Sequence, residues 1–301
     1  MRRVFLLLAL LIGVHTFHIL RKPNSKNHQE ITRIAILRAT AKDCERNQNY
    51  RTPNPLNSET LAKACGYDHG NFEKAIKIIT FHNVMTDITF VNSAKHHFDN
   101  EEFTAGKELI TTGIDRIVNL VEAVKFDDPR KTLGEILHSL QDFYSHSNWI
   151  ELGNTKPCTA LINPEEPIPN PAEKDQVTCE PHCANGNCGG KFRNAILEGH
   201  ILTSGYFELI SGAGKCSHGG SPDKTTVAGR SWDGINKDYS DSSHGSHHNK
   251  AADVAIDASV QLLEKIRERI DRENGNNFRR YREATYKLEL NLRRLSKYYK
   301  S

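Results

Sequence analysis

The chain has 301 residues, of which 37% are hydrophobic and 26% are charged, and its formal net charge is +3. This length suits one large domain or two small ones, and the composition excludes a chain that is disordered throughout. Loss of the two arginines at the amino terminus would lower the charge from +3 to about +1. Bulk charge therefore argues against a protein that binds polyanions.

The amino terminus has the pattern of a secretory signal peptide. Arg2 and Arg3 precede an apolar run over residues 5–14, which is much shorter than the roughly 20 residues that span a bilayer. Small residues before Phe17 predict cleavage at that point. We therefore expect residues 1–16 to be removed and the mature protein to be secreted, with an uncleaved signal anchor as the alternative.

Beyond this segment, apolar residues recur at helical spacing, and no segment shows the alternation of a strand. Helices are predicted over residues 28–42, 71–90, 100–124, 130–146, 191–210 and 248–270. Asn27 is a candidate N-cap for the first of them. Long loops rich in Pro, Gly, Asn and Ser are expected at about 44–70, 152–190 and 212–246. The pattern predicts one all-α domain over residues 17–275.

Seven cysteines fit an oxidising compartment. Cys44 and Cys65 flank the first long loop and form a plausible disulfide. A second group lies in and after the next long loop, at Cys158, Cys179, Cys183, Cys188 and Cys216. The run CEPHCANGNC is also compatible with a zinc knuckle, but in a secreted chain we favour disulfides that staple the loops. The odd cysteine has no predicted partner.

The final stretch, residues 276–301, differs from the rest of the chain in charge. It holds eight Lys or Arg against two Glu, and its apolar residues recur every three to four positions. This pattern is typical of an amphipathic helix on anionic lipid. A helix that packs on the body is an equally good interpretation.

Polar residues at four-residue intervals mark the segment LHSLQDFYSHSNW. His138 and Asp142 lie one above the other on a helix, and His146 continues the row. Imidazole and carboxylate groups are common zinc ligands, so this face offers three ligands to one metal. A solvated face with incidental histidines is the alternative. Further histidines recur near other helix starts, at His28, His96, His97, His244 and His248.

Several short blocks carry a resemblance to a known family: NHQEITRIAI, HFDNE, GEILHSLQDFYSHSNWIELG, LTSGYF, KCSHGG, GINKD and HNKAA. They resemble the Het-C heterokaryon-incompatibility family and the amino-terminal region of related animal von Willebrand A domain-containing proteins, over roughly residues 28–265. More distantly, the ligand order is similar to zinc-dependent bacterial phospholipase C and the fungal single-strand nucleases. The resemblance implies an all-α, multi-helix, zinc phospholipase C-like fold.

The resemblance also implies a ligand set. In chain order, the implied metal ligands are Phe17, His28, Asp87, His97, His138, Asp142, His146, His244 and His248. Asp142 would bridge two metals and Asp87 would serve as ligand or general base, although Asp99 is also close to His97. The chain departs from the phospholipase pattern in a shorter step from Asp142 to His146, and in a histidine at 248 where a glutamate is expected. We therefore expect two or three zinc ions.

Such a zinc cluster implies hydrolysis of a phosphodiester. The leading hypothesis is a secreted, zinc-dependent, phospholipase C-like phosphodiesterase that acts on phospholipid or at a membrane surface. One alternative is a non-catalytic extracellular recognition or adhesion-type module that retains metal for structure. The other is a zinc nuclease, which is less favoured because nucleic-acid binding relies on a basic surface.

Overall fold

The computed structural model describes residues 22–46, 50–123, 127–180, 190–207, 214–220 and 234–273. Within these ranges the regular structure is helical, with isolated β-bridges and no extended strand, so the all-α class is confirmed. The helices of at least four residues are α2 (His28–Cys44), α3 (Ser58–Cys65), α4 (His69–Thr89), α5 (Ala94–His97), α6 (Phe103–Glu122), α7 (Asp127–His146), α8 (Asn194–Glu198) and α9 (His248–Glu273). The predicted signal peptide, Phe17, Cys183, Cys188 and the tail at 276–301 lie outside the described residues. None of the helices described here has both the length and the apolar character needed to cross a membrane.

Local sequence explains where the first helices begin and end. The Asn27 side chain accepts a hydrogen bond from the Glu30 amide, and the Glu30 carboxylate accepts one from the Asn27 amide, which forms a capping box. Asn57 caps α3 in the same way, and Gly66 ends it with φ +73°. Helix α3 was not predicted, because its eight residues lie inside a stretch rich in Pro and Asn.

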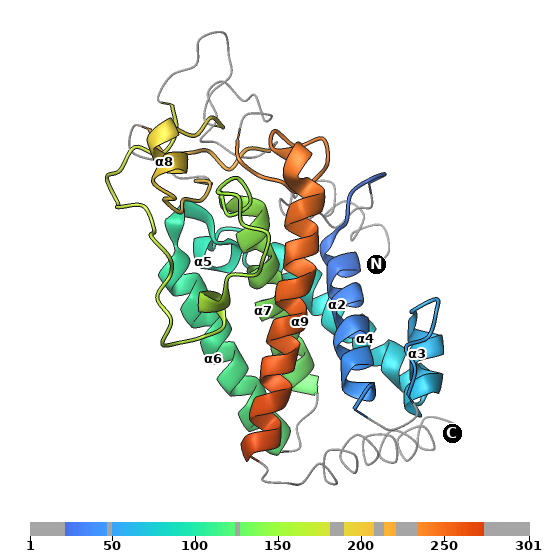
Figure 1. Cartoon of the computed structure of the whole chain (residues 1–301). Helices are drawn as coiled ribbons and strands as arrows, with labels where there is room; N and C mark the ends of the chain where they lie inside the picture. The colour runs from blue at the N-terminus through green and yellow to red at the C-terminus, as the bar shows by residue number, and fades with distance from the viewer. Residues whose placement is uncertain are drawn as a thin grey trace, which may run out of the picture.

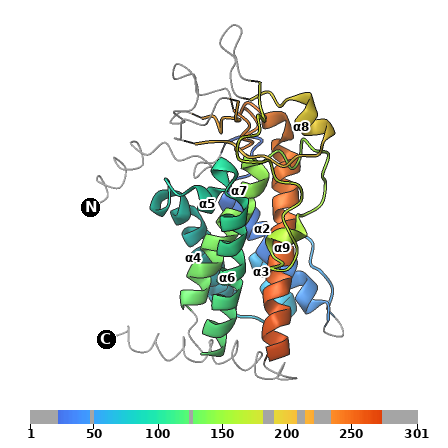
Figure 2. The same cartoon turned by 90° about the vertical axis from the view of Figure 1, so that its left-hand side faces the viewer.

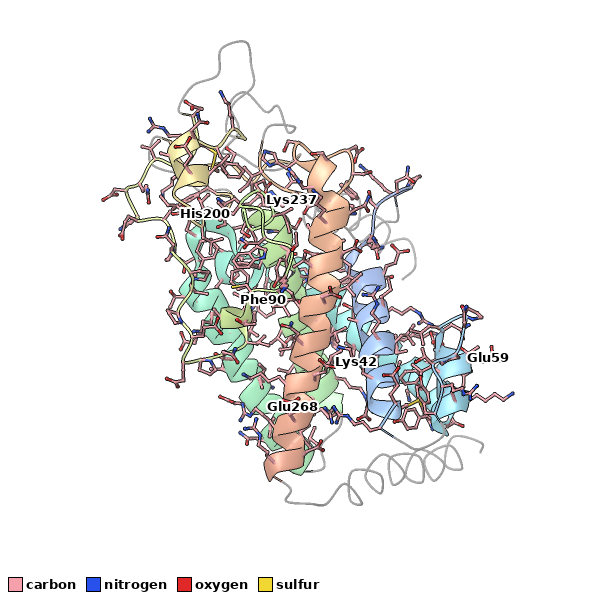
Figure 3. All side chains as sticks on the ribbon, in the orientation of Figure 1. Lys42, Glu59, Phe90, His200, Lys237 and Glu268 are labelled. Atoms are coloured by element: carbon pink, nitrogen blue, oxygen red, sulfur yellow. A yellow bond between two sulfur atoms is a disulfide. The ribbon has the colours of Figure 1, made fainter. Side chains whose placement is uncertain are left out.

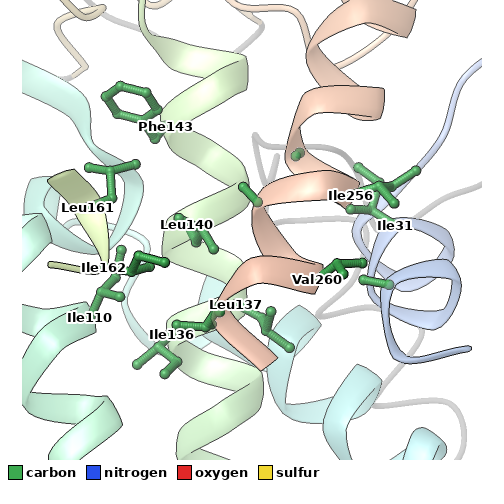
Figure 4. Packing of buried hydrophobic residues seen from close by; sticks show 14 of the residues in the cluster. Ile31, Ile110, Ile136, Leu137, Leu140, Phe143, Leu161, Ile162, Ile256 and Val260 are labelled. Carbon is green, nitrogen blue, oxygen red and sulfur yellow. The ribbon is translucent and has the colours of Figure 1, made fainter. Parts of the chain in front are cut away.

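Helix α7 lies at the centre of the body. It packs against α4, α6 and α9, while α2 packs against α9 and α4 (Figures 1 and 2). Figure 4 shows the apolar core between these helices, where Ile136 and Leu140 of α7 lie near Ile110 of α6, and Val260 of α9 lies near Ile31 of α2. Burial of this apolar surface is the main driving force for assembling the helices.

A glycine sets the distance between α4 and α7. A Cβ atom at Gly134 would lie 2.6 Å from the main-chain oxygen of Ile79 and 2.8 Å from the main-chain nitrogen of Asn83. Both atoms belong to the backbone of α4, so neither can turn aside as a flexible side chain would. The two helices therefore approach closely only because residue 134 has no side chain.

Irregular segments form a layer over one end of the helices, where Figure 3 labels Lys237 and His200, far from Lys42 and Glu268. The prediction of a helix over 191–210 is wrong for most of its described part, since only α8 is helical. His200 has φ +48°, which interrupts a helix. Residues 203–206 instead bond to neighbouring segments, for example from the Gly205 amide to the His146 oxygen at 2.9 Å.

Within the described residues, two disulfides hold the loops. The predicted pair Cys44–Cys65 is confirmed, and Cys179 pairs with Cys216. Cys158 is a free, buried thiol in the described part of the chain, and its amide donates to the Tyr144 hydroxyl at 3.0 Å. The second disulfide joins the loop predicted at about 152–190 to the loop predicted at about 212–246.

Candidate metal centre

The polar row of α7 points into the protein. His138, Asp142 and His146 are each 0% exposed, so the interpretation of a solvated helix face is wrong. Buried histidines and carboxylates need partners, because burial without compensation is costly for polar groups. The partners come from α2, α4, α5 and the loop layer, and they form two groups.

The first cluster consists of His28, Asp87, His97, His138 and Asp142. His28 is the first residue of α2, Asp87 lies in the last turn of α4, and His97 ends α5. All five side chains are at most 6% exposed. These residues are distant in the chain and meet because α2 and α4 both pack beside α7.

Asp142 lies at the centre of the first cluster and uses its two oxygens differently. Oδ1 lies 3.0 Å from Nε2 of His28, whereas Oδ2 lies 2.9 Å from Nδ1 of His97 and 2.9 Å from Nε2 of His138. His138 Nε2 is also 3.2 Å from His97 Nδ1 and 3.4 Å from Oδ1 of Asp87. A carboxylate with separate partners on each oxygen has the arrangement expected of a bridging ligand.

The second cluster consists of Asp99, His146, His218 and Asp238. Asp99 Oδ1 lies 3.2 Å from Nδ1 of His146, and Asp238 Oδ1 lies 3.3 Å from Nε2 of the same ring. The ring of His218 has its centroid 4.2 Å from that of His146. Ser145 donates a hydrogen bond of 2.6 Å to Asp238 and so orients its carboxylate.

One ring nitrogen is tied to an oxygen acceptor in four of the five histidines of the two clusters. His97 Nε2 lies 3.1 Å from the Phe90 carbonyl oxygen, His146 Nδ1 lies 2.8 Å from that of His97, and His218 Nδ1 lies 2.7 Å from that of Gly219. His28 Nδ1 lies 2.7 Å from the side-chain oxygen of Gln141. This arrangement is typical of metal-ligating histidines, because it fixes the ring and turns the other nitrogen toward the ion.

Burial sets the protonation of the first cluster. It lowers the pKa of His28 to about 3 and that of His97 to about 4, and it lowers the pKa of His138 well below 6.5. Burial raises the pKa of Asp142 well above 3.8, and the neighbouring carboxylates add to this effect. These three imidazoles are therefore neutral at pH 7, which is the state that binds metal.

His146 of the second cluster behaves in the opposite way. Burial alone would lower its pKa, but the carboxylates of Asp142, Asp99 and Asp238 outweigh burial and raise it. Asp238 shows the reverse balance, since burial would raise its pKa but the contact with His146 lowers it. A proton on His146 and a metal ion beside it are therefore alternative ways to neutralise these carboxylates.

The two remaining predicted histidines have other partners. His248 Nδ1 lies 2.7 Å from the Lys237 carbonyl oxygen, and its Nε2 accepts from the Lys26 amide at 2.9 Å. His244 lies 2.7 Å from both Oε1 of Glu151 and the Gly190 carbonyl oxygen. The structure thus brings six of the nine predicted ligands into the two clusters, places these two histidines elsewhere and leaves Phe17 undescribed.

Three cluster residues were not in the predicted ligand set. Asp99 was considered only as a competitor of Asp87, whereas His218 and Asp238 were not considered as ligands. Both lie in blocks that carry the family resemblance, KCSHGG and GINKD, so the blocks themselves held the missing signal. The sequence did not predict them as ligands because each is a single residue in a loop, with no second polar residue at helical spacing beside it.

The atoms of the first cluster suit a zinc ion. In a tetrahedral site with bonds of 2.0–2.1 Å, ligand atoms lie about 3.3 Å apart. His97 Nδ1, His138 Nε2 and Asp142 Oδ2 lie 2.9 to 3.2 Å from one another. Asp142 Oδ1, Asp99 Oδ1 and His146 Nε2 have no hydrogen-bond partner of good geometry within the described residues, although a ring nitrogen or carboxylate oxygen lies 3.0 to 3.3 Å from each. Buried nitrogen and oxygen atoms without such partners fit the donor set of a metal site.

The sequence of this chain is similar to known proteins. A profile of the VWA7 N-terminal domain family matches residues 56–276. Von Willebrand factor A domain-containing protein 7 of Mus musculus is 31% identical over 271 residues, which cover 84% of this chain and 30% of that protein. The proteins of that name from Rattus norvegicus and Homo sapiens are also 31% identical, over 273 and 270 residues, with the same coverage.

The chain spans about a third of the length of these relatives. No solved structure matches it.

Proposed function

The chain belongs to the VWA7 N-terminal domain family, and we propose that it is a secreted helical module that binds zinc ions inside its body. The observation that carries this proposal is the mutual spacing of His97 Nδ1, His138 Nε2 and Asp142 Oδ2 at 2.9 to 3.2 Å in a buried position. Three atoms with lone pairs repel at this distance unless a proton or a cation lies among them.

The charge of the two clusters supports a divalent cation. They bring four carboxylates, those of Asp87, Asp99, Asp142 and Asp238, into one buried region. The three histidines of the first cluster have lowered pKa values and do not balance this charge, and a proton on His146 balances only part of it. Isolated buried carboxylates cost several kcal/mol each, and metal coordination removes most of that cost.

We propose one ion at the first cluster and one at the second, with the bridging position of Asp142 as the place for a third. Zinc suits both sets, because neutral imidazole and carboxylate are its usual ligands. His244 and His248 are left out of this ligand set, since both nitrogens of each ring contact atoms of residues outside the two clusters.

Burial favours a structural role for the metal. The side chains of the first cluster and those of Asp99, His146 and Asp238 are at most 7% exposed, and His218 is 1% exposed. Structural zinc sites are closed in this way, whereas catalytic sites keep a position open to water or substrate. The metal would then consolidate the end of the body that the loop layer covers, as in an extracellular recognition or adhesion-type module.

Secretion is part of the proposal. Two disulfides agree with an oxidising compartment, and residues 1–16 have the pattern of a signal peptide. We propose residues 17–275 as the mature domain. Mass spectrometry of the protein released by expressing cells tests this, with an amino terminus at Phe17 as the expected result.

A second candidate function is phospholipase C-like hydrolysis of phosphodiesters. It is favoured by Asp142, whose two oxygens face different histidines, because bridged zinc pairs position a phosphate and lower the pKa of bound water. The resemblance to the Het-C family and the zinc phospholipases points the same way, and Asp87 would be the base. A phosphate ester would reach the buried cluster only after movement of the surrounding chain.

Elemental analysis of the purified protein tests the metal proposal. We expect at least two zinc ions per chain, fewer in His138→Ala, and an unchanged content in the matched control His82→Ala. His82 lies on α4, outside both clusters. A folded wild-type protein without bound metal, even after dialysis against zinc, contradicts the proposal.

Hydrolysis of phosphatidylcholine vesicles and of single-stranded DNA, each with and without chelator, separates the two functions. Turnover that chelator and His138→Ala both abolish supports the phosphodiesterase. Zinc binding without turnover of either substrate supports the structural role.

A further inference from the structure

A chain of hydrogen bonds runs from α9 through α7 to α2. Ser259 donates from its hydroxyl to the Ala255 oxygen at 2.7 Å, so toward Gln141 it can only accept. Gln141 Nε2 donates to this hydroxyl at 3.3 Å and to the hydroxyl of Thr32 at 2.9 Å. Both hydrogens of the Gln141 amide are therefore used, and all three side chains are buried.

These contacts fix which way the Gln141 amide faces. With its nitrogen toward the two hydroxyls, its Oε1 lies 2.7 Å from Nδ1 of His28 and 3.3 Å from Nδ2 of Asn83. Asn83 Nδ2 is a donor, which agrees with an oxygen at this position. The Ser259 hydroxyl decides this orientation, because it already donates to the Ala255 oxygen and can therefore only accept from the Gln141 nitrogen.

The orientation of Gln141 determines the tautomer of His28. An oxygen acceptor 2.7 Å from Nδ1 requires that Nδ1 carry the hydrogen. In a neutral imidazole the other nitrogen then presents its lone pair. That nitrogen, Nε2, lies 3.0 Å from Oδ1 of Asp142.

We propose that Gln141 is a positioning residue that holds His28 in its metal-binding tautomer, with the Nε2 lone pair toward Asp142. The metal part of this inference rests on the proposed function. His97, His146 and His218 use main-chain carbonyl oxygens for the same purpose, which no substitution removes. His28 instead uses the side-chain oxygen of Gln141, which a substitution can remove, so its tautomer can be tested by mutation.

The tautomer is measured directly on metal-free protein. Nitrogen-15 chemical shifts of the histidine rings distinguish Nδ1–H from Nε2–H, and the His28 signals are assigned by their loss in His28→Gln. We expect Nδ1–H in the wild type. In Gln141→Met, which lacks the acceptor, we expect Nε2–H to gain population. An Nε2–H tautomer in the wild type overturns the proposal without any reference to metal or to a variant.

Zinc affinity, measured by competition with a chromophoric chelator, gives the second readout. Loss of an orienting partner typically weakens metal binding about 10- to 100-fold, and we expect this for Gln141→Met. Gln141→Glu keeps an oxygen acceptor and should recover most of the affinity. The matched control is Ser139→Ala, also fully buried on α7, whose hydroxyl donates to the Glu135 carbonyl oxygen of the same helix at 3.4 Å.

The two readouts separate the possible failures. Wild-type affinity in Gln141→Met overturns the positioning role even when the protein binds zinc. Absence of zinc binding in the wild type overturns the proposed function, while the ring nitrogen shifts still decide the tautomer. If Gln141→Met does not fold, the proposal is tested by the nitrogen-15 shifts of His28 in the wild type and by the zinc affinity of Gln141→Glu.

Discussion

Helix α7 buries two faces of opposite chemistry. One face carries Ile136, Leu140 and Phe143, which pack among apolar residues of α6 and the neighbouring loop. The other carries His138, Asp142 and His146, which are equally buried but surrounded by polar groups. The first face stabilises the protein by leaving water, whereas the second gains stability only when its charges are balanced. The two faces are equally buried, but only the stability contributed by the polar face should depend on whether its charges are balanced.

Removal of metal should have the largest effect and should act on the polar face alone. A ligand present at 1,000 times its dissociation constant stabilises the folded state by about 4 kcal/mol. We therefore expect chelator to lower the free energy of unfolding by about that amount, measured by urea titration with added zinc or added chelator. Identical curves under the two conditions would show that the polar face needs no cation.

Leu137→Ala should have the next largest effect, and it should not depend on metal. Leu137 is 0% exposed, and such truncations cost about 2 to 5 kcal/mol through lost burial and the cavity left behind. The same loss should appear in zinc and in chelator. A loss that doubles in one of the two conditions would mean that the faces of α7 are coupled.

Asn27→Ala should cost about 1 kcal/mol, since it removes the N-cap of α2. Because α2 begins with His28, this variant tests whether the capped amino terminus of α2 or the metal holds the His28 ring in place. We expect zinc content to stay at the wild-type value while the unfolding midpoint falls slightly. Loss of zinc would instead make the capping box a part of the metal site.

Asp142→Asn should have the smallest effect when metal is absent. Burial and the adjacent carboxylates raise the pKa of Asp142, so its charged form does not stabilise the metal-free fold. We expect the free energy of unfolding in chelator to change by less than about 1 kcal/mol, in contrast to Leu137→Ala. In zinc the variant should lose the stabilisation that metal provides. A fall of several kcal/mol in chelator would show that Asp142 supports the fold by itself.

The helical pattern of the sequence predicted the body well because amphipathic periodicity reports which face is buried. It could not predict the irregular course of residues 199–207, since their hydrogen bonds go to segments near 148 and 216 that only the tertiary fold brings close. For the same reason α3 was missed, although Asn57 and Gly66 were readable as its caps.

The candidate site, like the fold, has residues that the sequence predicted and residues that it did not. The step of four from His138 to Asp142 marked one helix face correctly, and the family resemblance added His28, Asp87 and His97. An equal step from His244 to His248 places two rings beside Glu151, Gly190 and Lys237 instead. The spacing of residues in the sequence predicts which side chains lie on the same side of an element. It does not predict which residues these side chains contact, because this depends on tertiary packing. The contributions of His218 and Asp238 depend on packing entirely.

Gly134 carries no chemistry, yet the proposed metal centre depends on it. It lets the backbone of α4 lie against α7, and α4 brings Asp87 to His138, which is about one turn beyond Gly134 on α7. A single methyl group at this position would push the two helices apart about 6 Å along α7 from His138 and would disturb the ligand geometry without touching a ligand. Damaging variants of this domain should therefore be sought at its helix contacts as well as among its histidines and aspartates.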